Sequence, residues 1–321
     1  MELPVRLEQI QNAAQNIKPY IKRTPLIRCE NLDDVLSCHT YFKLECMQLT
    51  GSFKIRGAIN KLLNLTKEEK AGGVITASSG NHAQGVAYAS KVLGVKATVV
   101  LPLDVAEIKL NGCRASGAEI IRFGYTSAER RAKAEEIKNK SGLVSIHSYD
   151  DPVIIAGQGT VGLEILGDLE NVDCIVVPIG GGGLISGVAA AVKEKRPNTR
   201  IIGVEPSLVP RYTKSLEEGR PVVVETQNTL ADALKAAKAG INNYALIKKY
   251  VDEIATVDDD FIIKAFELII TSAKLLAEPS SCIVVAAVLG EKIKFSRNEK
   301  VVFLLSGGNI DKNRIVDYLK G

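Results

Sequence analysis

Short apolar runs rich in β-branched residues alternate along the chain with longer segments of helical character. The runs that predict strands cover residues 74–76, 97–101, 175–179, 201–204 and 301–305, and the helical segments include residues 83–92 and 184–193. This alternation predicts a mainly parallel, doubly wound α/β fold with helices on both sheet faces. Ligands of such sheets lie beyond the carboxyl ends of the strands, so we expect the chemistry in the loops 77–81, 180–183 and 306–308.

The length of the chain, 321 residues, is roughly twice that of a typical domain. Two domains or one large two-lobed unit are therefore expected. No low-complexity linker or internal repeat divides the sequence. A second domain is thus predicted to be interleaved with the first rather than appended to it.

Charge and composition argue against a nucleic-acid partner. Lys plus Arg number 41 and Asp plus Glu 37, which gives a net charge of +4. The densest basic cluster, at 130–133, is flanked by Glu129, Glu135 and Glu136, as is typical of a solvated helix face. Aromatic residues make up 5% of the chain and Trp is absent, so platforms for base stacking are not expected.

Three further features indicate a cytoplasmic protein without membrane contact. The apolar stretch 174–192 carries no charge but is interrupted by Pro178 and four glycines, which suits a buried strand, loop and helix better than a membrane span. No signal-peptide pattern follows Met1. The six cysteines form no CxxC pair, which favours reduced, buried thiols over disulfides or a zinc site.

Two familiar motifs are set aside. The glycines at 157, 159 and 162 match GxGxxG by spacing. They follow Asp151-Pro152, which predicts a helix start, whereas a dinucleotide site needs a preceding strand. The three histidines, His39, His82 and His147, lack the spacing of a zinc hydrolase.

Four consecutive glycines, Gly180, Gly181, Gly182 and Gly183, join a predicted strand to a predicted helix. Without Cβ atoms, their backbone N–H groups can converge on an anion, and the helix N-terminus adds positive potential. A tight turn in a buried crossover is the alternative, although one glycine usually suffices for it. We therefore favour a phosphate site.

Two other segments carry candidate chemistry. Ser78, Ser79, Gly80, Asn81 and His82 lie at a strand-to-helix junction whose hydroxyl and N–H groups suit a carboxylate, although a simple serine N-cap is also open. Lys54 is flanked by Phe53 and Ile55. An apolar setting can lower the pKa of a lysine and make it an amine nucleophile towards an aldehyde. A surface lysine is the alternative.

Together these segments resemble the fold-type II pyridoxal-phosphate (PLP) enzymes, specifically the subgroup of serine/threonine dehydratases and serine racemases. The resemblance runs nearly end to end. The matching motifs are Gly51-Ser52-Phe53-Lys54-Ile55-Arg56-Gly57, Ser78-Ser79-Gly80-Asn81-His82, Ala156-Gly157-Gln158-Gly159-Thr160, the four glycines, Glu278-Pro279 and Ser306-Gly307-Gly308-Asn309. It implies a tryptophan synthase β-like fold with two open-sheet domains. The large domain would comprise 1–49 and 146–321, and the small, mobile domain 50–145.

The resemblance also implies a role for each site residue. Lys54 would hold PLP as a Schiff base and remove the substrate α-proton. Phe53 would pack near the ring, and Asn81 would bind its 3-hydroxyl oxygen. The glycines at 180–183 would grip the phosphate and Ser306 would pair with the pyridine nitrogen. The substrate carboxylate would lie on residues 78–82.

The implied reaction is α,β-elimination from L-threonine or L-serine to a 2-oxo acid and ammonia. A serine at position 306, unlike an aspartate, does not enforce a protonated ring nitrogen, which favours elimination over transamination. Many dehydratases have alanine where this chain has Ser79, and serine racemases use that serine as a second acid/base. Serine racemase activity and 3-hydroxyaspartate dehydratase activity are therefore alternatives. A PLP-carrying binding protein without turnover is the non-enzyme alternative, and a homodimer is expected.

A divalent-metal site found in many relatives is altered here. Their pattern begins with Glu-Pro-Ser and continues to a second acidic residue. In this chain Glu205-Pro206-Ser207 is present, but Arg211 occupies the second acidic position. Replacing a carboxylate by a cation should weaken a Mg²⁺ or Ca²⁺ site. We hypothesise that Arg211 neutralises Glu205 in place of the metal. The substrate-side loop also departs from the family, with Ala233 in place of the usual glycine.

Overall fold

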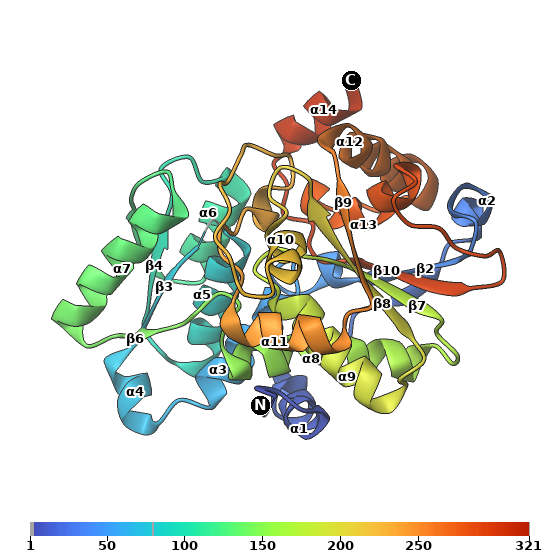
Figure 1. The fold of residues 1–321 in the computed structure, drawn as a ribbon. Helices are drawn as coiled ribbons and strands as arrows, with labels where there is room; N and C mark the ends of the chain where they lie inside the picture. Colours follow the sequence, from blue (N-terminus) through green and yellow to red (C-terminus); the bar gives the residue numbers. More distant parts are fainter. Residues whose placement is uncertain (1–2, 79, 321) are drawn as a thin grey trace.

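The computed structural model describes residues 3–78 and 80–320, which form two open sheets lying side by side (Figure 1). The larger sheet has the strand order β1 (Leu26–Arg28), β2 (His39–Leu44), β10 (Lys300–Leu305), β7 (Cys174–Pro178), β8 (Arg200–Pro206) and β9 (Glu253–Val257). The smaller has the order β5 (Glu119–Arg122), β4 (Ala97–Leu101), β3 (Val74–Ala77) and β6 (Val144–Ser145). Every pair is parallel except β1 with β2. The predicted fold class is confirmed.

Each predicted strand is present, with bounds that differ from the prediction by at most two residues. Most strands that the pattern did not reveal are short or lie at sheet edges, namely β1, β5, β6 and β9, whereas β2 lies inside the larger sheet between β1 and β10. β5 is only partly buried, and its pattern of apolar residues is correspondingly weak. Short or edge strands of this kind form only when they pair with neighbouring strands, because an isolated strand buries too little apolar surface to be stable.

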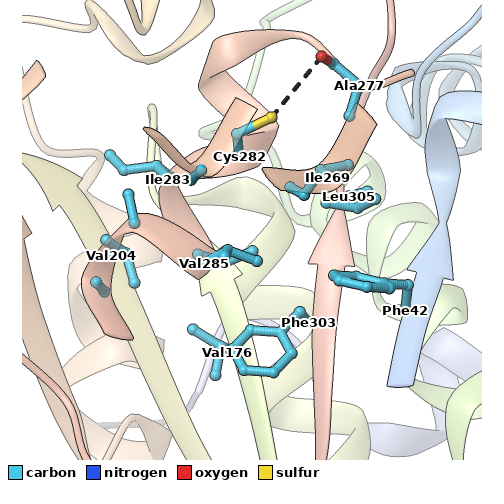
Figure 2. Packing of buried hydrophobic residues seen from close by; sticks show 14 of the residues in the cluster. Phe42, Val176, Val204, Ile269, Ala277, Cys282, Ile283, Val285, Phe303 and Leu305 are labelled. Atoms are coloured by element: carbon cyan, nitrogen blue, oxygen red, sulfur yellow. Dashed lines mark hydrogen bonds between the residues drawn. The ribbon is translucent and has the colours of Figure 1, made fainter. Parts of the chain in front are cut away.

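The larger sheet separates two hydrophobic cores, as the period-two pattern of its strands requires. In β10, Phe303 and Leu305 point into one core while Val302 and Leu304 point into the other. Figure 2 shows Phe303 and Leu305 packed with Val285 of α13. Helices that cover this first face are α2 (Asp33–Leu36), α12 (Asp259–Leu268), α13 (Pro279–Leu289) and α14 (Lys312–Lys320), with the π-helical turn η5 (Ile269–Ala273) after α12.

The second face of the larger sheet is covered by α1 (Leu7–Ile17), α8 (Pro152–Asp168), α9 (Gly183–Lys195) and α11 (Ile241–Tyr250). The GxGxxG glycines lie inside α8, which begins after the N-cap Asp151 as predicted. They serve close helix packing: a Cβ on Gly157 would lie 2.6 Å from the Cα of Gly57 on a neighbouring helix. The match to a dinucleotide motif is therefore accidental, as expected.

The smaller sheet has α5 (Asn81–Leu93) and α6 (Glu107–Ala115) on one face and α7 (Ser127–Ser141) on the other. α3 (Lys54–Leu63) lies between the two sheets, because it packs on both α5 and α8. The remaining elements are α4 (Lys67–Gly72), α10 (Arg211–Glu217) and the 3₁₀ turns η1 (Lys18–Tyr20), η2 (Glu30–Leu32), η3 (Glu45–Met47) and η4 (Asp232–Leu234).

A buried ion network fixes α3 on the larger sheet. The guanidinium of Arg56 donates to both carboxylate oxygens of Glu45 at 2.8 Å and to those of Glu164 at 2.8 and 2.9 Å. Lys43 of β2 adds a 2.7 Å contact to Glu164. Arg56 and Glu45 are fully buried. Because Arg56 follows Lys54 by two residues, this network also sets where the candidate lysine stands.

The cysteines and the helices bear on two further questions raised by the sequence, disulfides and membrane spans. All six cysteines are free thiols, and all but Cys46 are buried. Among residues 3–78 and 80–320, no helix combines the length and the apolar character that a membrane span requires.

We predict that Arg56→Met lowers the free energy of unfolding by about 3–5 kcal/mol, because it leaves the Glu45 carboxylate buried without a counter-charge. Urea denaturation followed by far-UV circular dichroism measures the change. Arg297→Met is the matched control: its ion pair with Asp34 spans 3.8 Å between side chains that are 82% and 94% exposed. The control should change stability by less than about 1 kcal/mol. Equal losses in the two variants would contradict the prediction.

Candidate active site

A cavity of about 1040 Å³ lies between the two sheets, and five of the predicted site residues lie on its wall. Both structural units contribute to its wall. The predicted residues on the wall are Lys54, Ser78, Asn81, His82 and Gly181, joined by Glu278 and Asn309 of two further motifs. Ser79 lies outside the described residues. Segments separated by more than half the chain therefore share one site.

Lys54 is the first residue of α3, and the loop before it is tied to the carboxyl end of β10. The backbone N–H of Phe53 donates to the carbonyl of Ser306 at 3.1 Å, and that of Gly308 donates to the carbonyl of Gly51 at 2.9 Å. Lys54 Nζ donates to the carbonyl of Ser148 at 2.9 Å and lies 5.1 Å from the centre of the Phe53 ring. The lysine is thereby held at the cavity wall.

Burial lowers the pKa of Lys54 to about 8, an effect that the nearby Glu278 carboxylate partly opposes. An ordinary lysine has a pKa near 10.4 and is almost fully protonated at neutral pH. A pKa of about 8 leaves a useful fraction of neutral amine, which is the form that attacks an aldehyde or accepts a proton.

Asn81 begins α5 and is fixed from two sides. Its Nδ2 donates to Glu278 Oε1 at 2.6 Å, and its Oδ1 accepts from Asn309 Nδ2 at 3.0 Å. Asn309 Nδ2 also donates to the carbonyl of Thr50 at 2.9 Å. The amide therefore has a fixed orientation at the site.

Glu278 is the main residue to which sequence reasoning gave no role, although Glu278-Pro279 was visible as a motif. Burial raises the pKa of Glu278 to about 7, and the ammonium of Lys109 opposes this effect. Lys109 of α6 lies 2.8 Å from Asp232 Oδ2 and 3.6 Å from Glu278 Oε2. No sequence signal marks Lys109, since it sits in an ordinary helix and meets its partners only through the tertiary fold.

The loop over 78–82 offers a helix N-terminus to the cavity. Ser78 Oγ accepts from the Gly80 N–H at 3.1 Å, and α5 begins at Asn81. The first N–H groups of a helix have no intrahelical partner and favour an anion. His82 is buried, with Nε2 3.3 Å from the carbonyl of Ile146. Burial and the charge of Lys54 lower the pKa of His82 to about 3, so this ring is neutral.

The glycine loop connects β7 to α9, as predicted. Gly182 has φ +93°, in the left-handed region that favours glycine, and a Cβ there would lie 2.4 Å from the Tyr212 hydroxyl oxygen. The backbone N–H groups of Gly180, Gly181 and Gly182 find no acceptor among the described residues. Unpaired N–H groups beside a helix start form an anion cradle.

Ser306 directly follows β10 and is buried. Its hydroxyl lies 3.0 Å from Ser281 Oγ, which also exchanges hydrogen bonds with the backbone of Gly307. Ser306 can therefore present a neutral hydroxyl whose orientation is set by a second serine.

The candidate metal residue Glu205 lies in β8, with Arg211 of α10 beside it. Arg211 Nη2 is 3.5 Å from Glu205 Oε1, and both side chains are fully buried. The ion pair agrees with the hypothesis drawn from the sequence. Within the part of the chain that the structure describes, no three His, Cys, Asp or Glu side chains gather as a metal site would require.

Comparison with known proteins places the chain among characterised enzymes. An L-threonine ammonia-lyase of Thermotoga maritima is 43% identical over 311 residues, 97% of this chain and 77% of that protein. A catabolic L-threonine dehydratase (TdcB) of Staphylococcus aureus is 41% identical over 314 residues, 97% of this chain and 91% of that protein. The solved structure of maize serine racemase is similar with a TM-score of 0.94 and 35% identity, over 99% of this chain and 97% of that one.

The residues at the cavity suit pyridoxal phosphate. The cofactor needs a primary amine for its aldehyde and N–H donors for its phosphate, and Lys54 and the loop 180–183 offer these groups. Residues 17–307 match the family described as "Pyridoxal-phosphate dependent enzyme". The chain therefore belongs to the family of pyridoxal-phosphate dependent enzymes.

Proposed function

We propose that this protein is an ammonia-lyase that converts L-threonine, and also L-serine, into the corresponding 2-oxo acid and ammonia. The observation that carries the proposal is the position of the Lys54 amine, on a cavity that also receives the glycine loop and the N-terminus of α5. The two relatives that are 43% and 41% identical act on L-threonine by name, which supports the choice of substrate.

Bound pyridoxal phosphate supplies an aldehyde that joins the substrate amino group and a ring that accepts electrons from the α-carbon. The protein binds the cofactor and the substrate and provides the group that accepts the α-proton. The N–H groups at 180–182 hold the phosphate, and the start of α5 holds the substrate carboxylate. Lys54, whose pKa is lowered by burial, accepts the α-proton through its neutral form. The β-hydroxyl takes up one proton and leaves as water, so the elimination removes the α-hydrogen and the hydroxyl together. Hydrolysis of the product then releases ammonia.

Ser306 favours elimination over the competing reactions. Its hydroxyl is paired with Ser281 and carries no charge, so it cannot hold a proton on the pyridine nitrogen as a carboxylate would. The weaker electron demand that results suits a substrate with a leaving group on the neighbouring carbon. L-Threonine and L-serine carry such a group as their β-hydroxyl.

Lys109 is not available to a second substrate carboxylate, because it lies 2.8 Å from Asp232 and 3.6 Å from Glu278. However, Arg131, Lys235 and Arg314 also line the cavity and could meet such a group. 3-Hydroxyaspartate is therefore kept as an alternative substrate, to be assayed beside L-threonine.

We also propose that the smaller sheet, with the surrounding residues 50–145, forms a domain that closes over the site, and that the protein acts as a cytoplasmic homodimer. Closure is supported by α6, which reaches across the cavity. Its first N–H groups, on Glu107 and Ile108, donate to Asp311 at 3.2 and 3.0 Å, and its Lys109 meets Asp232. The dimer is an expectation from the family resemblance.

Serine racemase activity is the second candidate. The similarity to the maize racemase, at a TM-score of 0.94, and the presence of Ser79 favour it. Racemisation needs an acid/base group on each face of the α-carbon, and Ser79 would be the group opposite Lys54.

The proposed function predicts that the PLP-loaded protein releases equal amounts of 2-oxo acid and ammonia from L-threonine. Lys54→Ala should lower kcat by about 10³-fold or more, because the proton acceptor is lost. Chromatography of the 2-oxo acid and an ammonia assay measure the products. Lys67→Ala, which alters an exposed lysine of α4, should retain wild-type turnover. Wild-type turnover in Lys54→Ala would refute the role of Lys54, and PLP binding without products from either amino acid would indicate a non-catalytic carrier.

The lowered pKa of Lys54 predicts how fast the cofactor-free protein takes up PLP. Only the neutral amine attacks, so the rate should rise about tenfold per pH unit below pH 8 and level off above it. Stopped-flow absorbance measures the rate, with Nα-acetyllysine as a reference for the titration of the cofactor itself. In Glu278→Gln the midpoint should fall, because the Glu278 charge raises the pKa of Lys54. A midpoint near pH 10 would contradict the burial argument.

The product ratio from L-serine separates the two candidate activities. If Ser79 is the second acid/base group, Ser79→Ala should abolish D-serine formation and leave pyruvate formation measurable. Chiral chromatography quantifies both products in one sample. If the wild-type protein forms pyruvate and no D-serine, racemisation is rejected.

A further inference from the structure

The ion pair of Arg211 and Glu205 forms part of a larger buried cluster around the start of the glycine loop. Arg211 Nη2 donates to the carbonyl of Ile179 at 3.3 Å and to that of Val209 at 3.0 Å. Its Nη1 donates to the carbonyl of Gly180. One guanidinium thus lies among three carbonyl oxygens and one carboxylate.

This set of oxygen atoms is of the kind that a hard divalent cation prefers. However, a cation does not fit beside Arg211. Both Glu205 oxygens accept backbone hydrogen bonds, from Tyr212 N–H at 3.0 and 3.1 Å and from Thr213 N–H at 3.0 Å. Glu205 is the one carboxylate that the cluster contains among the described residues. A second positive charge would lie within contact distance of the guanidinium.

Tyr212, the residue after Arg211, binds a further carbonyl of the glycine loop. The Tyr212 hydroxyl donates to the carbonyl of Gly181 at 2.7 Å and accepts from the N–H of Gly240 at 3.1 Å. Arg211 and Tyr212 therefore hold three successive carbonyls, those of Ile179, Gly180 and Gly181.

Because these carbonyls are held in place, the orientation of the backbone N–H groups on the opposite side of the loop is also fixed. In a trans peptide the C=O of one residue and the N–H of the next point in opposite directions. The carbonyls of residues 179–181 point to α10, so the N–H groups of residues 180–182 point away from it. Those N–H groups are the ones without an acceptor among the described residues.

We propose that Arg211 is a positioning residue, a cation built into the protein that holds the glycine loop in its anion-binding conformation and removes the need for a divalent metal there. The proposal rests on the assignment of the cofactor phosphate to residues 180–183. It assigns to the Arg211 guanidinium the place of the divalent cation that the family resemblance implies for chains with a second carboxylate at this position.

The first test uses the wild-type protein. PLP is titrated into the cofactor-free protein with EDTA or with millimolar Mg²⁺, and binding is followed by absorbance and by the ³¹P resonance of the bound cofactor. The dissociation constant and the resonance should be the same in both media. A loss of affinity in EDTA that Mg²⁺ restores would overturn the proposal.

The second test exchanges the cation. Arg211→Asp would place a second carboxylate beside Glu205. It should weaken PLP binding about 10–100-fold, the value of one or two charge-assisted hydrogen bonds, and Mg²⁺ should now restore affinity. Arg211→Lys keeps the positive charge, but a single ammonium cannot reach all three carbonyls that Arg211 contacts, those of Ile179, Gly180 and Val209. It should show a smaller loss, a shifted ³¹P resonance and no response to Mg²⁺.

Arg220→Asp is the matched control, because the Arg220 side chain is 72% exposed just beyond α10. It should bind PLP like the wild type. Wild-type affinity and ³¹P shift in Arg211→Lys would overturn the proposal even if Arg211→Asp fails to fold. Since these readouts follow cofactor binding and not turnover, they remain valid if the protein proves inactive on L-threonine, which would reject the proposed function alone.

Discussion

The buried contact between the Arg56 guanidinium and the carboxylates of Glu45 and Glu164 determines where α3 can lie. Burying a carboxylate or a guanidinium alone costs much free energy, and the cost falls only when the opposite charges lie in contact. The contact therefore fixes the relative positions of all three groups. Because Lys54 stands half a helical turn before Arg56, the network sets the start of the helix and, with it, the position of the amine. An ion pair that contributes little net stability can in this way specify an active site.

Burial acts on the two central ionisable groups in opposite directions. It lowers the pKa of Lys54 to about 8 and raises that of Glu278 to about 7, so both groups titrate near neutral pH. The two groups come from distant parts of the sequence and line one cavity, in which Asn81 and Lys109 of the smaller unit contact Glu278. The contacts that join the two structural units therefore also surround the groups whose pKa values are shifted.

Two buried arginines thus support the two ends of the proposed cofactor site. Arg56 supports the helix that begins with Lys54, and Arg211 supports the glycine loop, to which we assign the cofactor phosphate. Each is bound by oxygen atoms on several sides, and each acts from outside the cavity. In both cases the planar guanidinium holds more than one acceptor at fixed angles, which the single ammonium of a lysine cannot do.

The sequence alone determined the parallel α/β fold, the main strands and the loops at their carboxyl ends, because period-two apolar patterns and glycine runs are local properties. The glycine loop could be selected for the same reason, whereas the roles of Lys54 and Asn81 were inferred from the resemblance of the surrounding motifs to a known family. The part played by Lys109 and Glu278, the orientation of Ser306 by Ser281, and the grip of Arg211 and Tyr212 on three carbonyls were decided by the tertiary structure. These features depend on which distant side chains are buried together, and burial and proximity set the pKa values and hydrogen bonds that no local pattern encodes.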